Sequence, residues 1–205
     1  PKYAINDGSL FLMGNGYLGM RGTFMEGKKT DYAGIIVTDT WDNADGKWEE
    51  LSTVMNGLFA DLKVDGQSIF KKPWSDFNRT LDLATGITTR EVTIHLNNVN
   101  VTIKEEKFAS MDDVHVIPMR VSVTADRPID LNLSQGIDAD VWSLNGTHLK
   151  DVSFESNDLG LFSQARLSSA HDIIAVATQC DVHDIVKQPL AITSQTRITL
   201  SPNTP

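Results

Sequence analysis

The residues that most resemble a functional motif are glycines near the N-terminus, in the pattern Gly14-x-Gly16-x-x-Gly19. This spacing matches the fingerprint of dinucleotide-binding folds, which also needs an acidic residue about 20 positions later. Asp39 lies at that distance. The fingerprint further requires a helix directly after the glycines, but residues 20–31 show no apolar repeat at helical spacing. The pattern therefore predicts a β turn or bulge shaped by glycine.

Histidines and carboxylates are the other side chains that could perform catalysis or hold a metal. The histidines are far apart in the sequence, and none shows the spacing of a metal site. Acidic pairs such as Asp112-Asp113 point to opposite faces of a strand, so they cannot act together on one bond. Asp138 and Asp140 could share a face, but a solvated loop is the simpler interpretation. We therefore expect neither a metal site nor a catalytic residue in this chain.

Two tryptophans stand beside carboxylate and amide side chains, a combination that suits carbohydrate. They occur in Trp41-Asp42-Asn43 and in Trp74-Ser75-Asp76. An indole ring stacks on the apolar face of a sugar, while Asp and Asn side chains hydrogen-bond to its hydroxyls. Tryptophans that pack in the core or under loops are the alternative. The candidates for residues near a substrate are Trp41, Asp42, Asn43 and Trp74.

An arginine and the single cysteine also stand out among apolar neighbours. Arg21 predicts a buried or interface ion pair, with Asp39 and Asp82 as candidate partners. Cys180 ends the apolar run 173–180, which predicts a buried structural thiol. A chain without cysteine pairs is typical of a reducing compartment, so we expect a cytoplasmic protein.

The composition is that of an ordinary globular domain of 205 residues with a net charge of −9. The basic residues are scattered, which argues against nucleic acid as a partner, because phosphate contacts need clustered Lys and Arg. No apolar run approaches the length of a membrane span, and no signal peptide opens the chain. The chain begins abruptly at Pro1 and ends in a segment rich in proline and polar residues. We interpret it as a piece of a longer protein.

The elements that must position these residues are predicted to be strands. Alternating apolar runs recur at short spacing and are separated by turn signals, of which Asp65-Gly66 is the strongest. Long strands are expected at 114–124 and 190–200, and one short helix is expected at 48–55. The pattern predicts an all-β fold in which two large antiparallel sheets pack face to face.

Three blocks of the sequence resemble family 65 of the glycoside hydrolases, which includes maltose, trehalose and kojibiose phosphorylases. They are residues 9–22, 77–91 and 107–115, in the order that the family has them. In the third block Lys107 stands where the family pattern has Arg. Beyond residue 136 only the general β character agrees. The motif residues of these blocks are Gly14, Asn15, Gly16, Gly19, Arg21, Gly22, Arg79, Asp82 and Arg90.

The resemblance implies a fold, an activity and a place in a larger enzyme. Residues 1–205 would form one N-terminal super-β-sandwich of the galactose mutarotase type, with few short helices. An (α/α)6 barrel that carries the catalytic acid would follow. The family reaction is inverting phosphorolysis of an α-glucoside to β-glucose 1-phosphate, with inorganic phosphate as co-substrate and no cofactor. This domain would then support the barrel, the mouth of the active site and a homodimer, without catalysing a reaction alone.

Two other interpretations remain open at this point. The same sandwich could belong to a hydrolase of the family, such as an acid trehalase, in which water replaces phosphate as the attacking group. It could instead be an independent carbohydrate-binding module, in which case Trp41→Ala or Trp74→Ala would abolish sugar binding.

Overall fold

The computed structural model describes residues 8–44, 46, 48–96 and 98–181. The described chain is nearly all antiparallel β-sheet, which confirms the expected all-β class. None of the described residues belongs to a helix long and apolar enough to cross a membrane. The strands are β1 (Met13–Gly14), β2 (Leu18–Met20), β3 (Ile35–Asp42), β4 (Glu50–Val54), β5 (Asn56–Val64), β6 (Gln67–Ser68), β7 (Trp74–Asp82), β8 (Ile87–Leu96), β9 (Val99–Lys107), β10 (Met119–Ala125), β11 (Leu131–Asp138), β12 (Leu149–Asn157), β13 (Gly160–Leu167) and β14 (Ile173–Thr178), with a short 3-10 helix η1 (Lys29–Asp31).

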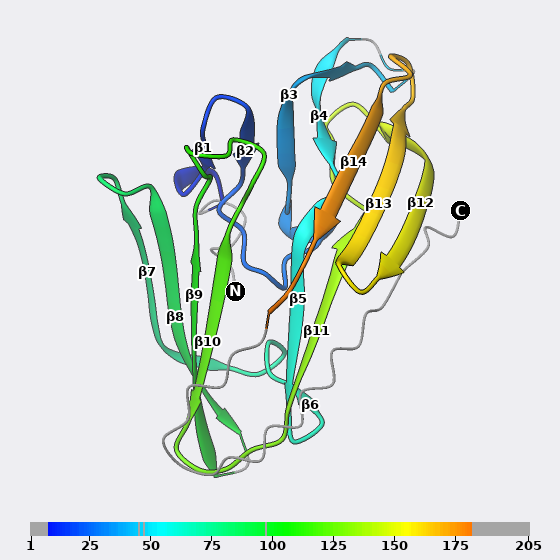
Figure 1. The fold of residues 1–205 in the computed structure, drawn as a ribbon. Coiled ribbons are helices and arrows are strands. Elements are labelled where there is room, and N and C mark those ends of the chain that lie inside the picture. The colour runs from blue at the N-terminus through cyan, green and yellow to red at the C-terminus, as the bar shows by residue number, and fades with distance from the viewer. Residues whose placement is uncertain (1–7, 45, 47, 97, 182–205) are drawn as a thin grey trace.

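One layer of the sandwich is the sheet β10-β9-β8-β7 (Figure 1). Its central strands alternate buried and outward residues, as the sequence predicted for Val92, Ile94 and Leu96. The period of two places every second side chain on the face that meets the other layer. The next strand, β9, buries Val99, Val101 and Ile103 on that same face.

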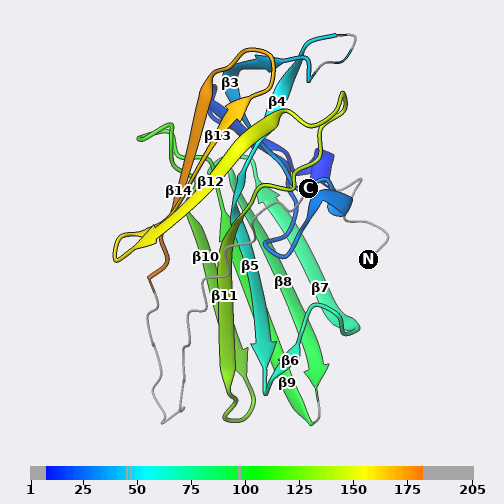
Figure 2. The same ribbon diagram turned by 90° about the vertical axis from the view of Figure 1, so that its right-hand side faces the viewer.

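The facing layer contains the sheet β11-β5-β6, and Figure 2 shows β5 and β11 lying over the strands of the first layer. Leu62, Val64 and Ile69 from this side pack against Val92 and Ile94. The hairpin between β5 and β6 turns at Asp65-Gly66, where both residues have positive φ, 48° and 77°. This turn type matches the right-handed twist of the flanking strands, so the predicted hairpin is confirmed.

A second core joins the sheet β1-β2-β3-β4 to the sheet β12-β13-β14. Met20, Ile35 and Val54 of the first sheet belong to the same buried cluster as Leu161 and Leu167 of the second. β5 and β11 link the two cores: Leu62 and Val64 of β5 belong to the first cluster, and Ile137 of β11 belongs to the second, where β11 contacts β13 and β14. The molecule is therefore a sandwich whose facing layer is assembled from several sheets.

Two of the expected elements are wrong in type or extent, and a third lies outside the described residues. Residues 48–55 do not form a helix: β4 occupies Glu50–Val54, because pairing with β3 and burial of alternate side chains override the weak helical spacing. The strand expected at 114–124 begins only at Met119, directly after Pro118, whose nitrogen cannot donate to a ladder. The strand expected at 190–200 lies outside the described residues.

Candidate functional site

The buried faces of β8 and β9 change from aliphatic to ionic toward one end of the sheet. Leu96, Ile94 and Val92 on β8 are followed on the same face by Arg90. On β9 the buried row Val99, Val101 and Ile103 continues into Glu105 and Lys107. The register pairs Val92 with Ile103 and then Arg90 with Glu105. One end of the core is therefore an ion-pair network built directly into the sheet.

The network has four charged side chains, which pair in a continuous chain. Arg90 Nη1 lies 2.6 Å from Glu26 Oε1, and Arg90 Nη2 lies 2.8 Å from Glu105 Oε2. Lys107 Nζ lies 2.8 Å from Glu105 Oε1 and also donates to the carbonyl of Thr23. The Met25 amide donates to Glu105 Oε2 at 3.2 Å. These contacts fix the irregular segment 22–27 across the ionic end of the sheet.

The two carboxyl groups of the network have pKa values that are shifted in opposite directions. Burial alone would raise the pKa of Glu105, but Lys107 and Arg90 together hold it below its ordinary value. The pKa of Glu26 is raised, because burial outweighs the single partner Arg90. Burial alone would lower the pKa of Arg90, but the neighbouring carboxylates of Glu105 and Glu26 raise it above its ordinary value. Glu105 is therefore the fixed anion of the network, and Glu26 is the carboxyl that protonates more readily.

Aromatic rings enclose the guanidinium groups of the second sequence block. The guanidinium of Arg90 lies 4.2 Å from the centre of the Phe24 ring, and that of Arg79 lies 4.0 Å from the centre of the Phe11 ring. Arg79 also donates to the carbonyl of Gly22. A side chain at position 22 would collide with Phe11 of the first block and Arg79 of the second, whose Cβ and Nη2 would lie 2.4 and 2.6 Å from the added carbon. Glycine at position 22 therefore allows the close approach of the first and second blocks.

The first block turns in a hairpin between β1 and β2, as predicted from its glycines. Gly16 has a φ of 91° in this turn, a conformation that favours glycine. Asn15 Oδ1 accepts from the amides of Tyr17 and Leu18 at 3.0 and 2.9 Å. Its Nδ2 donates to the carbonyls of Ser110 and Val114 at 2.6 and 2.9 Å. Asn15 thus shapes its own turn and also joins the first block to the third.

The remaining motif residues have local structural contacts. Gly14 and Gly19 face each other in the hairpin. Arg21 Nη1 donates to Ser9 Oγ at 2.9 Å, and its guanidinium lies 5.9 Å from the centre of the Tyr32 ring. Asp82 closes the turn after β7, where the Ala84 amide lowers its pKa by donating to the carboxylate at 2.8 Å. The pairing of Arg21 with Asp39 or Asp82 stays a prediction.

Asp42, one of the candidates for a residue near a substrate, is buried in a second polar network. Its carboxylate accepts from Ser168 Oγ at 2.7 Å and from the amides of Ser169 and Ala170 at 2.6 and 3.0 Å. His148 Nδ1 lies 2.6 Å from the same carboxylate. Burial would raise the pKa of Asp42, but these hydrogen bonds lower it well below its usual range. Asp42 is therefore held as an anion that ties the end of β3 to the loop after β13.

His148 was not distinguished by the sequence, yet it lies at the centre of this second network. Its side chain is fully buried, with Nε2 2.7 Å from Glu50 Oε1 and Nδ1 against Asp42. Each of the two ring nitrogens therefore lies at hydrogen-bond distance from a different carboxylate. Only the approach of β3, β4 and β12 brings these three residues together, and no local spacing in the sequence indicates it.

The structure divides the four candidates for substrate contact between two places. Asn43 adjoins the His148 network, where its Oδ1 accepts from Ser169 Oγ at 2.5 Å. Trp41 lies two residues before Asn43 and is 52% exposed. Trp74 instead stacks on Phe77 with ring centres 5.7 Å apart and touches Phe24. The structure does not bring Trp74 into the network of Asp42 and Asn43, and contact of any of the four with a substrate stays a prediction.

Two expectations about single residues can be compared with the structure. Cys180 is exposed, so the prediction of a buried thiol is wrong: the residue follows the end of β14, and the apolar run does not carry it into the core. Asp138 and Asp140 lie at the surface end of β11, where Asp140 pairs with Lys29 at 2.8 Å. Among the described residues, no group of three or more His, Cys, Asp or Glu could hold a metal.

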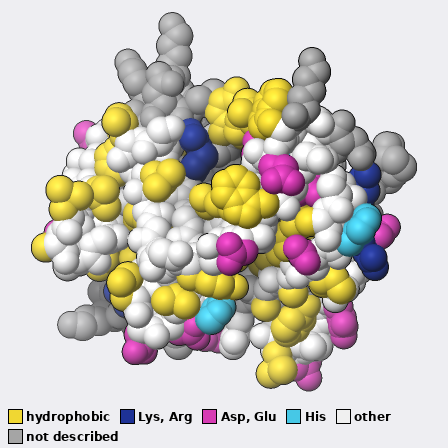
Figure 3. Space-filling view, turned by 90° about the horizontal axis from the view of Figure 1, so that it is seen from above, with side chains coloured by type: hydrophobic (Ala, Val, Ile, Leu, Met, Phe, Trp, Pro, Cys, Tyr) yellow, Lys and Arg dark blue, Asp and Glu magenta, His cyan; other side chains and the backbone are white. Residues whose placement is uncertain are grey.

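Figure 3 views the molecule from the end that is uppermost in Figure 1, where the β1–β2 hairpin and the upper ends of β3 and β4 lie. Apolar side chains gather on this face, with acidic ones between them. The large apolar side chains that the described chain exposes include Leu12, Trp41, Met111 and Val116. Such an arrangement is typical of a surface that meets another protein or domain.

Comparisons with known proteins identify the family. The profile of the N-terminal domain of glycosyl hydrolase family 65 matches residues 1–205. A 1,2-alpha-glucosylglycerol phosphorylase from Bacillus selenitireducens is 47% identical over 181 residues, which cover 87% of this chain and 24% of the relative. A nigerose phosphorylase from Lachnoclostridium phytofermentans is 31% identical over 153 residues, covering 73% and 20%.

A solved structure agrees with the fold. The chain matches a candidate kojibiose phosphorylase from the human microbiome with a TM-score of 0.74 and 18% identity, over 82% of this chain and 24% of that one. The chain thus spans between a fifth and a quarter of the length of these relatives. The resemblance of the three sequence blocks is confirmed, and the chain belongs to glycosyl hydrolase family 65, as its N-terminal domain.

Proposed function

We propose that this chain is the accessory sandwich of an inverting phosphorylase that acts on an α-glucoside. The observation that carries the proposal is the 47% identity with a 1,2-alpha-glucosylglycerol phosphorylase, of which the chain covers only 24%. Other relatives are nigerose, kojibiose and maltose phosphorylases. The rest of the protein, expected to be an (α/α)6 barrel, would supply the catalytic acid.

The proposed reaction needs one protein acid and one phosphate. A phosphate oxygen attacks the anomeric carbon from the face opposite the leaving group, while the bond from that carbon to the glycosidic oxygen breaks. The acid gives its proton to the departing oxygen. An α-glucoside then yields β-glucose 1-phosphate and the freed acceptor, and no cofactor takes part.

The sandwich would contribute position rather than chemistry. The hairpin and the 108–118 loop are joined by Asn15, and the ionic network fixes the segment that follows the hairpin. This end also exposes Leu12, Met111 and Val116. We propose that it docks against the catalytic barrel beside the mouth of the active site and supports a homodimer, in a cytoplasmic enzyme.

The test is an assay of the full-length protein with and without inorganic phosphate. The substrates are 1,2-α-glucosylglycerol, nigerose, kojibiose and maltose, and phosphorus NMR identifies the anomer of the glucose 1-phosphate formed. Phosphate-dependent formation of the β anomer supports the proposal. Release of free glucose at the same rate without phosphate would assign the protein to the hydrolases, and turnover by residues 1–205 alone would show that the chain is not an accessory domain.

A further inference from the structure

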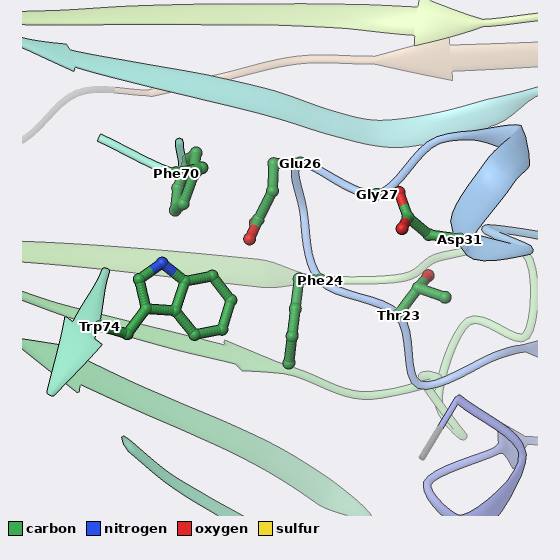
Figure 4. A pocket seen from close by; sticks show the side chains of 7 residues that line it. All are labelled: Thr23, Phe24, Glu26, Gly27, Asp31, Phe70 and Trp74. Atoms are coloured by element: carbon green, nitrogen blue, oxygen red, sulfur yellow. The ribbon is translucent and has the colours of Figure 1, made fainter. Parts of the chain in front are cut away.

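A pocket of about 170 Å³ opens between the segment 23–27 and the aromatic residues that precede and begin β7. Figure 4 shows the side chains of Phe70, Trp74 and Phe24 around the space and the carboxyl group of Glu26 directed between them. Its lining residues are Thr23, Phe24, Glu26, Gly27, Asp31, Phe70 and Trp74. The pocket therefore combines aromatic walls with two carboxyl groups.

Glu26 provides an acceptor that the described protein does not use. Its Oε1 is held by Arg90 at 2.6 Å, while its Oε2 is buried and has no hydrogen-bond partner among the described residues. Leaving a buried carboxylate oxygen without a donor costs free energy. Burial also raises the pKa of the Glu26 carboxyl group, so a donor from a ligand would stabilise its ionised form. Glu26 is thus suited to a ligand hydroxyl group.

The charged groups around the pocket would repel an anion and would partly repel a cation. The carboxyl groups of Glu26 and Asp31 disfavour an anion. The same carboxyl groups would attract a cation, but the guanidinium of Arg90 already lies over Phe24, Phe70 and Trp74, at 4.2, 5.4 and 5.6 Å from their ring centres, and would repel it. A neutral ligand with hydroxyl groups and an apolar face meets neither repulsion.

The size of the pocket limits the ligand to one ring. A site for a drug-sized molecule has a volume of at least about 300 Å³. We propose that this pocket binds a free neutral monosaccharide, whose hydroxyl group hydrogen-bonds to Glu26 Oε2 and whose apolar face contacts Trp74. The inference goes beyond the supporting role proposed above, because it gives the sandwich a ligand of its own.

The test uses the full-length protein labelled with 5-fluorotryptophan, with D-glucose as the probe. The fluorine resonance of Trp74 is identified by its loss in Trp74→Phe, so the signal reports on this pocket and not on sugar bound elsewhere. The expected result is a saturable shift of this resonance, with a Kd on the order of 1 to 10 mM, corresponding to about −3 to −4 kcal/mol. The measurement requires no turnover, so it remains decisive whether or not the enzyme is a phosphorylase.

Variants locate the binding group. Glu26→Gln replaces an acceptor oxygen by a donor nitrogen and should weaken glucose binding about tenfold, as expected for a hydrogen bond to a charged group. Asp31→Asn, which lies outside the Arg90 network, should weaken binding less and checks the site if Glu26→Gln unfolds the protein. Glu106→Gln is the control, because it removes a carboxylate from β9 that pairs with Lys104 outside the pocket. Absence of a saturable shift, equal affinity in Glu26→Gln, or a shift caused by tetramethylammonium and not by glucose would overturn the proposal.

Discussion

Arg90 on β8 and Glu105 on β9 are direct cross-strand partners, with Arg90 Nη2 2.8 Å from Glu105 Oε2 and side-chain exposures of only 2% and 3%. The pair sits where aliphatic partners would continue the core. Both residues contact the segment 22–27: Arg90 pairs with Glu26, and Glu105 accepts a hydrogen bond from the Met25 amide. An ion pair inside the sheet therefore specifies where the chain from the N-terminal hairpin crosses the sandwich.

Removing either partner of this pair should destabilise the fold strongly. Arg90→Met leaves Glu105 with only Lys107, and Glu105→Gln leaves Arg90 with only Glu26, so each should lower the free energy of unfolding by about 3–5 kcal/mol. Urea unfolding measures the change. Arg120→Met on β10 is the matched control, because Arg120 is exposed and its loss should cost less than about 0.5 kcal/mol.

A double-mutant cycle separates the pair from its surroundings. Arg90→Met with Glu105→Met should cost less than the sum of the two single changes, because the double variant leaves no uncompensated partner. Strict additivity would show that the two side chains do not interact and would contradict the network described here.

Asn15→Asp should detach the hairpin from the loop that follows β9. The substitution places a carboxylate oxygen where Nδ2 now donates to the carbonyls of Ser110 and Val114. We expect a loss of about 1–3 kcal/mol and faster amide exchange in residues 110–116. Hydrogen exchange with mass spectrometry measures this, with Asn78→Asp on the exposed side of β7 as the control. Unchanged exchange in the loop would mean that the two blocks are held together by other contacts.

Asp42→Asn should produce a defect that depends on pH. The folded state lowers the pKa of Asp42 below its ordinary value of 3.8, so the ionised group stabilises the fold above that value. This contribution is lost as the pH falls through the folded pKa. The variant should therefore be less stable than the natural sequence by about 3 kcal/mol at neutral pH, and the difference should shrink below about pH 4.

Urea unfolding from neutral pH down to about pH 3 measures this difference. Asp158→Asn, in the exposed turn after β12, is the control. A defect of the same size at every pH would show that shape, and not ionisation, makes Asp42 necessary.

Cys180 should react with a thiol reagent in the folded protein. The residue is exposed, although partial desolvation and the neighbouring Asp181 raise the pKa of its thiol. One more thiol should therefore be titrated by Ellman's reagent in the native protein than in Cys180→Ser, with a rate that rises as the pH approaches the thiol pKa. Equal titration of the two proteins under native conditions would indicate a buried thiol.

Much of the fold could be predicted because its signals are local. The alternation of Val92, Ile94 and Leu96 requires one face of a strand to be buried, and Asp65-Gly66 specifies a hairpin through backbone conformation alone. The turn of the first block likewise follows from Gly16. The helix expected at 48–55 failed because its spacing was weak and pairing with β3 determined the structure.

The polar networks could not be predicted, because their partners are distant in the sequence. Glu26 and Arg90 are 64 residues apart, and Asp42 and His148 are 106 apart. A charged residue that continues a buried row, as Arg90 and Glu105 do, was the available signal. That row shows where a buried charge lies, but only the packing of the layers shows which partner neutralises it.

The proposed phosphorylase function is tested most directly by the phosphate dependence of glucoside cleavage by the full-length protein. We expect β-glucose 1-phosphate to form from an α-glucoside only when inorganic phosphate is present, and Arg90→Met to reduce this activity together with stability. Phosphate-independent release of glucose, or full activity from a protein that lacks residues 1–205, would contradict it.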